Sequence, residues 1–334
     1  MSTGVVRSSR ARRQCRPAPP RAQRGIALLV AILLVALGTM LAVAVGYENA
    51  MTARRGTATF ALDQALLIQQ GAEALSAYGV RQIHQSDPSH TYINQGWDKP
   101  YGPMEVVPGV MLTAGLEDMQ GRLNLNNLVN QDGTPNPAYV AAFTQLLEML
   151  GLEPKWTGFL VDWIDYDIVP QNPDGAEDSV YMGQTPPYRT ANRYITSPSE
   201  LLALPGFGHD RYMLLAPYVT ALPWGTKINV CTASGVVLDA FLGSGHTEFS
   251  ADPQQLAKNR ASSTGCFPTI QNYQAAFRQN AQGSSVSSGF TETTSYFRLT
   301  SFITIGSAQF NLYSLLYQDQ TGALRPIQRS FTAD

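Results

Sequence analysis

The sequence predicts an α+β protein: one long N-terminal helix packs against an antiparallel sheet, and a large helical block is inserted within that sheet. Three observations predict it. The apolar run Ile26–Gly46 continues without proline to about His84. Residues 119–245 contain several helix-like runs. The C-terminal residues from 296 onward are rich in β-branched and aromatic residues, which favour strands. A helix layer packed on a sheet satisfies all three patterns.

The N-terminal apolar run is long enough to cross a membrane. Ile26–Gly46 has no charged residue and only Thr39 is polar. At about 1.5 Å per residue, these residues span a hydrocarbon core of roughly 30 Å. Residues 1–25 contain seven Arg and no Asp or Glu, so the positive-inside rule places the N-terminus in the cytoplasm. We therefore expect a transmembrane segment at 26–46 that begins a helix reaching residue 84 or 85.

The remaining elements follow from turn residues and apolar spacing. Strands are expected at Met104–Val107 and Val110–Leu116, and again at Tyr296–Ile305, Ala308–Tyr317 and Leu324–Phe331. Helices are expected at Pro137–Leu150, Lys155–Asp165, Pro198–Ala203, Asp210–Ala216, Ala233–Leu242 and around Tyr273–Gln279. This order predicts an α+β body from 47–118 and 285–334, with 119–284 as a mainly helical inserted domain.

The acidic charge of the chain is concentrated in one segment. After residue 25 the chain carries 16 basic and 25 acidic residues. Residues 116–178 alone contain eleven acids and two bases, and 162–178 contain six carboxylates without Lys or Arg. Carboxylate and carbonyl oxygens are the ligands of Ca²⁺. His and Cys are absent there, which argues against Zn²⁺. The spacing is not that of an EF-hand, so a solvated acidic loop is the alternative.

No catalytic constellation stands out. The four His lie outside any metal or nucleophile motif, and the Ser244 segment lacks the first glycine of a nucleophile elbow. A membrane-tethered hydrolase using Asp162 and Asp165 is a weighed alternative, because two nearby carboxylates can act as acid and base. A structural role for that pair is favoured, so we expect no enzyme.

Two segments with glycine turns resemble helix-hairpin-helix units, Ser199–Gly208 and Lys227–Gly245. Residues 196–250 contain two bases and four acids, which favours helix packing over phosphate binding. Cys15 belongs to the N-terminal segment. Cys231 and Cys266 both follow the membrane segment, where an oxidising compartment permits a disulfide, and we hypothesise that they form one.

The N-terminus carries a family resemblance. Arg24-Gly25 directly before an apolar helix that continues as an amphipathic one resembles type IV prepilins and pseudopilins. Most of these have Glu at the fifth mature position, where this chain has Val30. Its absence is a mark of the K-type minor pseudopilins of type II secretion. The run Gly121–Leu128, GRLNLNNL, is similar to the opening of the inserted domain of that family.

The resemblance implies specific chemistry and partners. A prepilin peptidase would remove residues 1–25 as a leader after Gly25 and methylate Ile26. Calcium would bind the acidic loop, through Asp165, Asp167, Glu177 and Asp178, with Asp174 as a further candidate. The protein would be a single-pass inner-membrane protein with its C-terminal domain in the periplasm, in contact with membrane lipid.

The implied role is in the assembly of the pseudopilus that serves the export of folded proteins. The family implies a tip complex with the I- and J-type minor pseudopilins and the major pseudopilin, initiating and capping the pseudopilus without nucleic acid. The alternative is a membrane-anchored DNA receptor of competence type that uses the helix-hairpin-helix-like units.

Overall fold

The computed structural model describes residues 24–262, 265–278 and 289–331. Of the predicted leader, residues 1–23 lie outside this described part, as does the predicted domain boundary at 284/285. The chain forms two units, one ending at Phe60 and the other beginning at Ala61. The helix α1 (Arg24–Ser86) belongs to both.

In the first unit, α1 carries the apolar run on a helix whose side chains from Ile26 to Ala50 are almost all exposed. An exposed helical surface of this length and composition is what a hydrocarbon environment requires. The helix is long and apolar enough to cross a membrane, as expected.

The second unit is built on a five-stranded antiparallel sheet with the order β1-β2-β7-β8-β9. The strands are β1 (Tyr101–Val107), β2 (Val110–Asp118), β7 (Tyr296–Ile305), β8 (Ala308–Gln318) and β9 (Leu324–Ser330). The sheet pairs β2 with β7 over nine consecutive residue pairs, from Val110 opposite Ile305 to Asp118 opposite Phe297. Everything between them in the sequence is therefore inserted at one place in the sheet, which confirms the predicted fold class.

The second half of α1 covers one face of this sheet. Small and aliphatic side chains line that side of the helix, at Ala61, Ala65, Ile68, Ala72, Val80 and Ile83, and the buried Ser76 completes their spacing of three or four residues. Alternate residues of β2, β7 and β8, such as Leu112, Leu299 and Leu312, pack against them. The alanines leave little volume between helix and sheet, so the two can approach closely.

A buried carboxylate ties α1 to the far edge of the sheet. Glu73 is almost fully buried and accepts two hydrogen bonds from Arg329 of β9, at 2.7 and 2.8 Å, and one from Ser314 of β8 at 2.6 Å. Burial alone would raise the pKa of Glu73, but these hydrogen bonds and the Arg329 charge lower it below its usual value. The helix is thus held to β8 and β9 by charge as well as by apolar packing.

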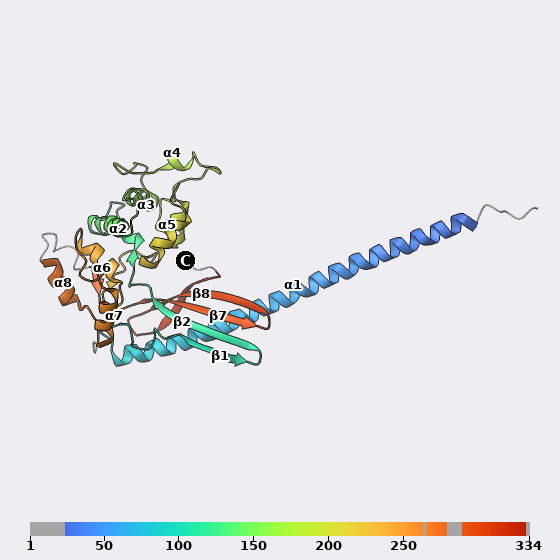
Figure 1. The fold of residues 1–334 in the computed structure, drawn as a ribbon, viewed down its shortest axis with the longest axis horizontal. Coiled ribbons are helices and arrows are strands. Elements are labelled where there is room, and N and C mark those ends of the chain that lie inside the picture. Colours follow the sequence, from blue (N-terminus) through green and yellow to red (C-terminus); the bar gives the residue numbers. More distant parts are fainter. Residues whose placement is uncertain (1–23, 263–264, 279–288, 332–334) are drawn as a thin grey trace, which may run out of the picture. The chain divides into compact units, whose positions relative to one another are not determined.

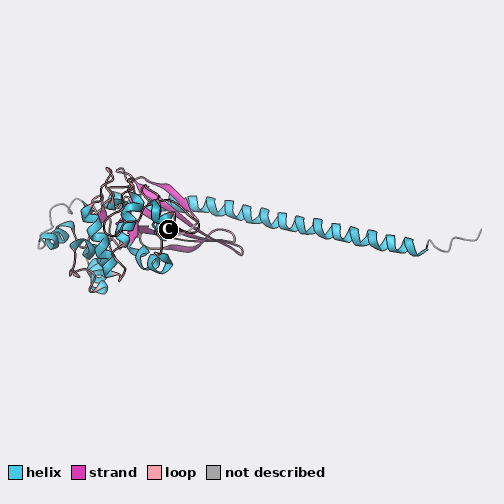
Figure 2. Ribbon diagram, turned by 90° about the horizontal axis from the view of Figure 1, so that it is seen from above, coloured by secondary structure: helices cyan, strands magenta, loops and turns pink. Residues whose placement is uncertain are grey.

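The inserted block is mainly helical and has its own apolar core. Its longer elements are α2 (Pro137–Met149), α3 (Trp156–Ile164), the 3₁₀ helix η2 (Pro198–Ala203), α5 (Gly208–Leu215), α6 (Gly235–Leu242), α7 (Pro253–Ser262) and α8 (Ile270–Arg278). Figure 1 shows these helices gathered beside one end of the sheet, and Figure 2 shows the same separation of helices and strands from a second direction. The short helices η1 (Leu125–Leu128), α4 (Asp178–Tyr181) and η3 (Ala216–Tyr218) complete it.

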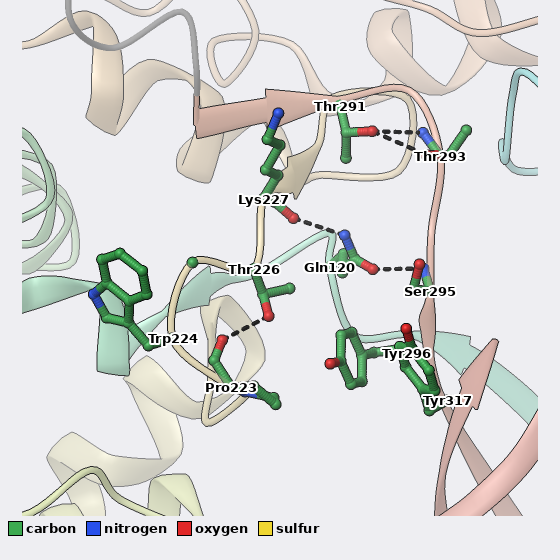
Figure 3. A pocket seen from close by; sticks show the side chains of 11 residues that line it. Gln120, Pro223, Trp224, Thr226, Lys227, Thr291, Thr293, Ser295, Tyr296 and Tyr317 are labelled. Atoms are coloured by element: carbon green, nitrogen blue, oxygen red, sulfur yellow. Dashed lines mark hydrogen bonds between the residues drawn. The ribbon is translucent and has the colours of Figure 1, made fainter. Parts of the chain in front are cut away.

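Polar side chains join the inserted block to the sheet. Asp118, the last residue of β2, is buried and accepts hydrogen bonds from Thr232, Thr294 and Asn229 at 2.5, 2.6 and 3.3 Å. The Gln120 side chain donates to the Lys227 carbonyl and accepts from the Ser295 amide. Figure 3 shows both hydrogen bonds among the residues that line a shallow pocket of about 350 Å³. The first and last residues of the insertion are therefore linked to each other.

The inserted block contains two similarly built halves. Each begins with a basic residue, an aliphatic residue and Asn, at 122–124 and 227–229. In each half these residues form a short strand paired in parallel with a later one, β3 (Leu123–Asn124) with β4 (Val219–Thr220) and β5 (Ile228–Asn229) with β6 (Phe290–Thr291). Parallel pairing needs a crossover, and the helices supply it.

The two halves also share a helix-to-loop contact. In α3 and α6 a glycine precedes a buried Asp by four residues, Gly158 before Asp162 and Gly235 before Asp239. A Cβ on either glycine would overlap a carbonyl of the loop that follows. Each Asp accepts hydrogen bonds from amides of that same loop, from Gln171 and Ala176 in the first half and from Phe249 and Ser250 in the second. This contact fixes both loops against their helices.

We expect Gly235→Ala to lower the free energy of unfolding by about 3 kcal/mol, because the added methyl meets the Phe249 backbone and no side chain can yield. The control is Gly71→Ala in α1, where nothing lies within 4 Å of the added atom and helix propensity predicts a small gain. Denaturant unfolding of both variants in micelles is the measurement. Equal midpoints for the two variants would contradict the packing described.

Candidate metal centre

The acidic residues of the insertion lie where α3 ends. Asp165 is the C-terminal cap of α3, and the chain then runs through an irregular segment to the short helix α4. We call residues 165–178 the acidic loop. Figure 1 shows α4 at the edge of the helical block farthest from the sheet. The loop is held at its base by the Asp162 carboxylate, which accepts from the Gln171 and Ala176 amides at 3.1 and 2.6 Å.

Three carboxylates of the acidic loop converge. One oxygen each from Asp165, Asp167 and Glu177 lie within 4.8 Å of one another. Asp165 is fully buried, and neither of its carboxylate oxygens has a hydrogen-bond donor within the described part of the chain. Glu177 is also buried; its Oε2 accepts from Thr190, and its Oε1 has no donor among the described residues. Buried oxygens without donors that point toward one another form a ligand set for a hard cation.

The electrostatics of this cluster oppose ionisation. Burial, followed by the charges of Asp167, Asp162 and Glu177, raises the pKa of Asp165 to about 7. Burial and then the Asp162 charge raise the pKa of Glu177 to about 7. No Lys or Arg contacts these oxygens among the described residues. A cation bound between them would remove this cost by replacing the protons.

Two further buried oxygens, on residues near the acidic loop, were not predicted from the sequence. The Asn192 Oδ1 and the Tyr181 hydroxyl are buried and have no hydrogen-bond partner within the described residues. Asn192 has a φ of 46°, a left-handed conformation that Asn tolerates better than most residues, and its Nδ2 donates to the Asp167 carbonyl at 3.2 Å. An Asn amide oxygen is an ordinary calcium ligand. The sequence did not indicate Asn192 as a ligand, because it lies far along the chain from the acidic residues.

The other two acids predicted as ligands have different surroundings. Asp178 accepts from the Thr190 amide and hydroxyl at 3.1 and 3.2 Å and lies 3.8 Å from an Arg189 nitrogen. Asp174 is exposed, and it is its carbonyl, not its carboxylate, that faces Gly158. The convergent set therefore contains Asp165, Asp167 and Glu177, with Asp178 one residue away and Asp174 at the rim.

The structure gives Asp162 a structural role. Its carboxylate accepts two loop amides, as Asp239 does in the second half of the insertion. Burial raises the pKa of Asp162 to about 6. An Asp already engaged with backbone amides is poorly placed to act as an acid or base on a substrate, so the geometry gives the hydrolase alternative no support.

The remaining predicted sites are placed as follows. Cys231 and Cys266 are joined by a disulfide. Gly25 and Ile26 lie in the first turn of α1, and Ile26 is exposed. At the first glycine turn, Arg211 donates to the Gly206 and Phe207 carbonyls, so this base closes its own turn. The helix-hairpin-helix character of these segments stays a prediction.

The fold and this loop together define a class: a subunit with an apolar N-terminal helix, an antiparallel sheet on its second half and a helical insertion bearing a cluster of carboxylates. The family model for type II secretion system protein K matches residues 121–224. Type II secretion system protein K of Pseudomonas aeruginosa is 30% identical over 92% of this chain and 93% of its own length. The chain belongs to the type II secretion system protein K family.

Other comparisons agree with this. Type II secretion system protein K of Klebsiella pneumoniae is 38% identical over 63% of this chain and 66% of its own length. A chain in the crystal structure of the GspK-GspI-GspJ complex from enterotoxigenic Escherichia coli superposes with a TM-score of 0.69 at 21% identity, covering 84% of this chain and all of that chain. At that identity the superposition supports the fold alone. The family is a structural component of a secretion system and not an enzyme family.

The raised pKa values predict a pH dependence with a definite sign. Between about pH 4.5 and about pH 7 the cation-free folded state binds protons at Asp165 and Glu177 that the unfolded state has released, so the free energy of unfolding falls as the pH rises through this window. We expect Asp165→Asn to lose part of that fall. Melting temperatures of both proteins in EGTA across this range are the measurement. Parallel pH profiles would contradict the burial of an unpaired carboxylate.

Proposed function

We propose that this protein is a minor pseudopilin of the type II secretion system that acts at the tip of the pseudopilus, where it initiates and caps assembly for the export of folded proteins. Membership of the protein K family, together with an apolar α1 that begins directly at Arg24-Gly25, carries the proposal. The helical insertion supports a terminal position, because its helices gather beside one end of the sheet (Figure 1) and would obstruct an identical subunit stacked there.

Val30 supports the same position. In the pseudopilins that this chain resembles, a Glu at the fifth mature position is expected to pair with the N-terminal amine of a neighbouring subunit. Val30 is half exposed in an apolar helix and carries no charge. A subunit without that carboxylate offers no partner to an amine above it, while its own amine at Ile26 can still pair with a carboxylate below. The contact is therefore one-sided, as a terminal subunit requires.

Anchoring and processing follow from the N-terminus. The seven arginines before Ile26 keep that end in the cytoplasm, and the body beyond α1 is then periplasmic. A prepilin peptidase removes residues 1–25 and methylates Ile26. The partners proposed are the I- and J-type minor pseudopilins, the major pseudopilin and inner-membrane lipid. The related GspK chain occurs in a complex with GspI and GspJ.

The acidic loop is proposed to hold Ca²⁺. Asp165, Asp167 and Glu177 supply carboxylate oxygens, and Asn192 supplies an amide oxygen. Asp178, which shares the Thr190 hydroxyl with Glu177, is a further candidate. Five of the buried oxygen atoms without a hydrogen-bond partner among the described residues belong to Asp165, Glu177, Tyr181 and Asn192. The Asp165 and Glu177 oxygens converge and Asn192 donates to the Asp167 carbonyl, which supports a cation as their ligand. The ion would stabilise the insertion and not take part in a reaction.

The processing step is tested by mass spectrometry of the protein extracted from membranes. We expect an intact mass that begins at Ile26 with one added methyl group, because a prepilin peptidase cuts after Gly25. Gly25→Leu should accumulate as the uncut precursor. Gly38→Leu, a substitution within the apolar run that leaves the cut site unchanged, should be processed normally. A mature N-terminus elsewhere in the chain would remove the assignment to this class of subunit.

Calcium binding is tested by thermal unfolding. We expect Ca²⁺ at 100 times its Kd to stabilise the protein by about 2.7 kcal/mol, and EGTA to remove the effect. Asp165→Asn should abolish the shift because it removes the charge of the central ligand. Glu148→Gln removes an exposed carboxylate of α2 and should leave the shift intact. An equal response of the two variants, or no response of the unaltered protein to millimolar Ca²⁺, would exclude the site.

A further inference from the structure

The acidic loop carries an unusual set of exposed apolar side chains. Outside α1, the three most exposed large apolar residues of the described chain are Ile168, Val169 and Tyr166, at 76, 67 and 61%. The next are near 56% and lie on α5 and at the C-terminus. All three belong to one run of four residues between the cation-facing Asp165 and Pro170. We call these three side chains the apolar tip.

The apolar tip is held in place from below. A Cβ on Gly133 would overlap the Tyr166 ring, so this ring lies directly on the backbone of the 130–134 turn. The Asp167 carboxylate accepts from the Val169 amide at 2.7 Å, and the Asp167 carbonyl accepts from Asn192. The segment is therefore shaped by contacts at each end while Ile168 and Val169 project outward. Exposed apolar side chains on a preorganised loop mark a docking surface.

The charge around the tip favours one kind of partner. Residues 165–178 contain five acids and no Lys or Arg, so the segment stays at −3 even with one Ca²⁺ bound. Asp167, between two residues of the tip, and Asp174, further along the same loop, are exposed. The only cation paired with the loop among the described residues is Arg189 on Asp178. A negative rim is repelled by an anionic lipid surface. It complements a protein surface that carries Lys or Arg.

We propose that the apolar tip, Tyr166, Ile168 and Val169, docks into an apolar pocket of a partner protein whose rim carries Lys or Arg. The loop lies at the edge of the helical block farthest from the sheet, so it is accessible while the sheet is engaged elsewhere (Figure 1). Docking itself does not require the proposed calcium site. The expected effect of calcium on docking does rest on it, since the ion would fix Asp165 and Asp167 on either side of Tyr166.

The first experiment replaces Ile168 with the photo-crosslinker benzoylphenylalanine in the full chain, expressed in a secreting strain. We expect a calcium-enhanced adduct with one protein, which mass spectrometry then identifies. That protein, purified, should bind the unaltered chain in micelles. Ile168→Ser with Val169→Ser should weaken this binding about tenfold or more, as loss of a buried apolar anchor does, and Asp174→Lys should weaken it with a reduced salt dependence.

The matched control is Met213→Ser with Leu214→Ser, two comparably exposed apolar residues on α5, which should leave the Kd unchanged. An adduct with lipid, an adduct with a second copy of this chain, no adduct, or equal affinities of the two double variants would each overturn the proposal. Because the side chains of Ile168 and Val169 carry no oxygen that could bind a cation, their variants should keep the calcium-induced melting shift. Docking without any calcium response would instead remove the calcium site and leave the docking surface standing.

Discussion

The pairing of β2 with β7 is the constraint on which the rest of this structure depends. Their unbroken register from Val110 to Asp118 means that the chain leaves the sheet and returns to it across a single strand spacing of about 4.8 Å. The inserted residues must therefore fold around a core of their own, and the apolar core of the helical block is indeed distinct from that beneath the sheet. The buried Asp118 closes the junction. Its carboxyl group accepts hydrogen bonds from Asn229 and Thr232, at the start of the second half of the insertion, and from Thr294, at its end, so these bonds fix the sheet to the helical block.

The acidic loop follows a different rule. The carboxylate of Asp118 is buried but has four donors, whereas that of Asp165 is buried with none among the described residues. A buried carboxylate without a donor or counter-ion costs several kcal/mol when ionised. At neutral pH the folded conformation of the loop therefore requires that protons or a cation neutralise the charges of these carboxylates. The shape of the segment between Asp165 and Glu177, and with it the projection of Ile168 and Val169, is therefore linked to what neutralises the cluster.

The sequence predicted most of what local patterns determine. Strand Tyr296–Ile305 and the 3₁₀ helix Pro198–Ala203 were predicted to the residue, because alternation and an N-terminal Pro are local signals. The helix α7 was not predicted: its composition is polar, and only Leu256 and Arg260 are buried. Arg260 is buried because it donates to the carbonyls of Val230, Ala233 and Phe267, which only the tertiary fold brings together.

Charge counting located the acidic loop. It could not show that Asp174 is exposed or that Asn192 donates to the Asp167 carbonyl, since both depend on the path of an irregular segment.

Comparison of the two halves of the insertion distinguishes two roles among the acidic residues. One Asp in each half holds a loop to its helix, whereas the converging carboxylates occur in the first half alone. Asp162 and Asp239 occupy equivalent places, each four residues after a glycine against which the following loop packs. The carboxylate of each accepts hydrogen bonds from amides of that loop. Neither half needs a cation for this contact. In the first half the loop that Asp162 secures carries Asp165, Asp167 and Glu177, while the corresponding segment after Asp239 contains glycines, serine and a single Glu248. The second half is instead bound by the Cys231–Cys266 disulfide. One scaffold thus carries a covalent cross-link in its second half and, in its first, carboxylate oxygens within 4.8 Å of one another, an arrangement whose mutual repulsion a bound cation would neutralise.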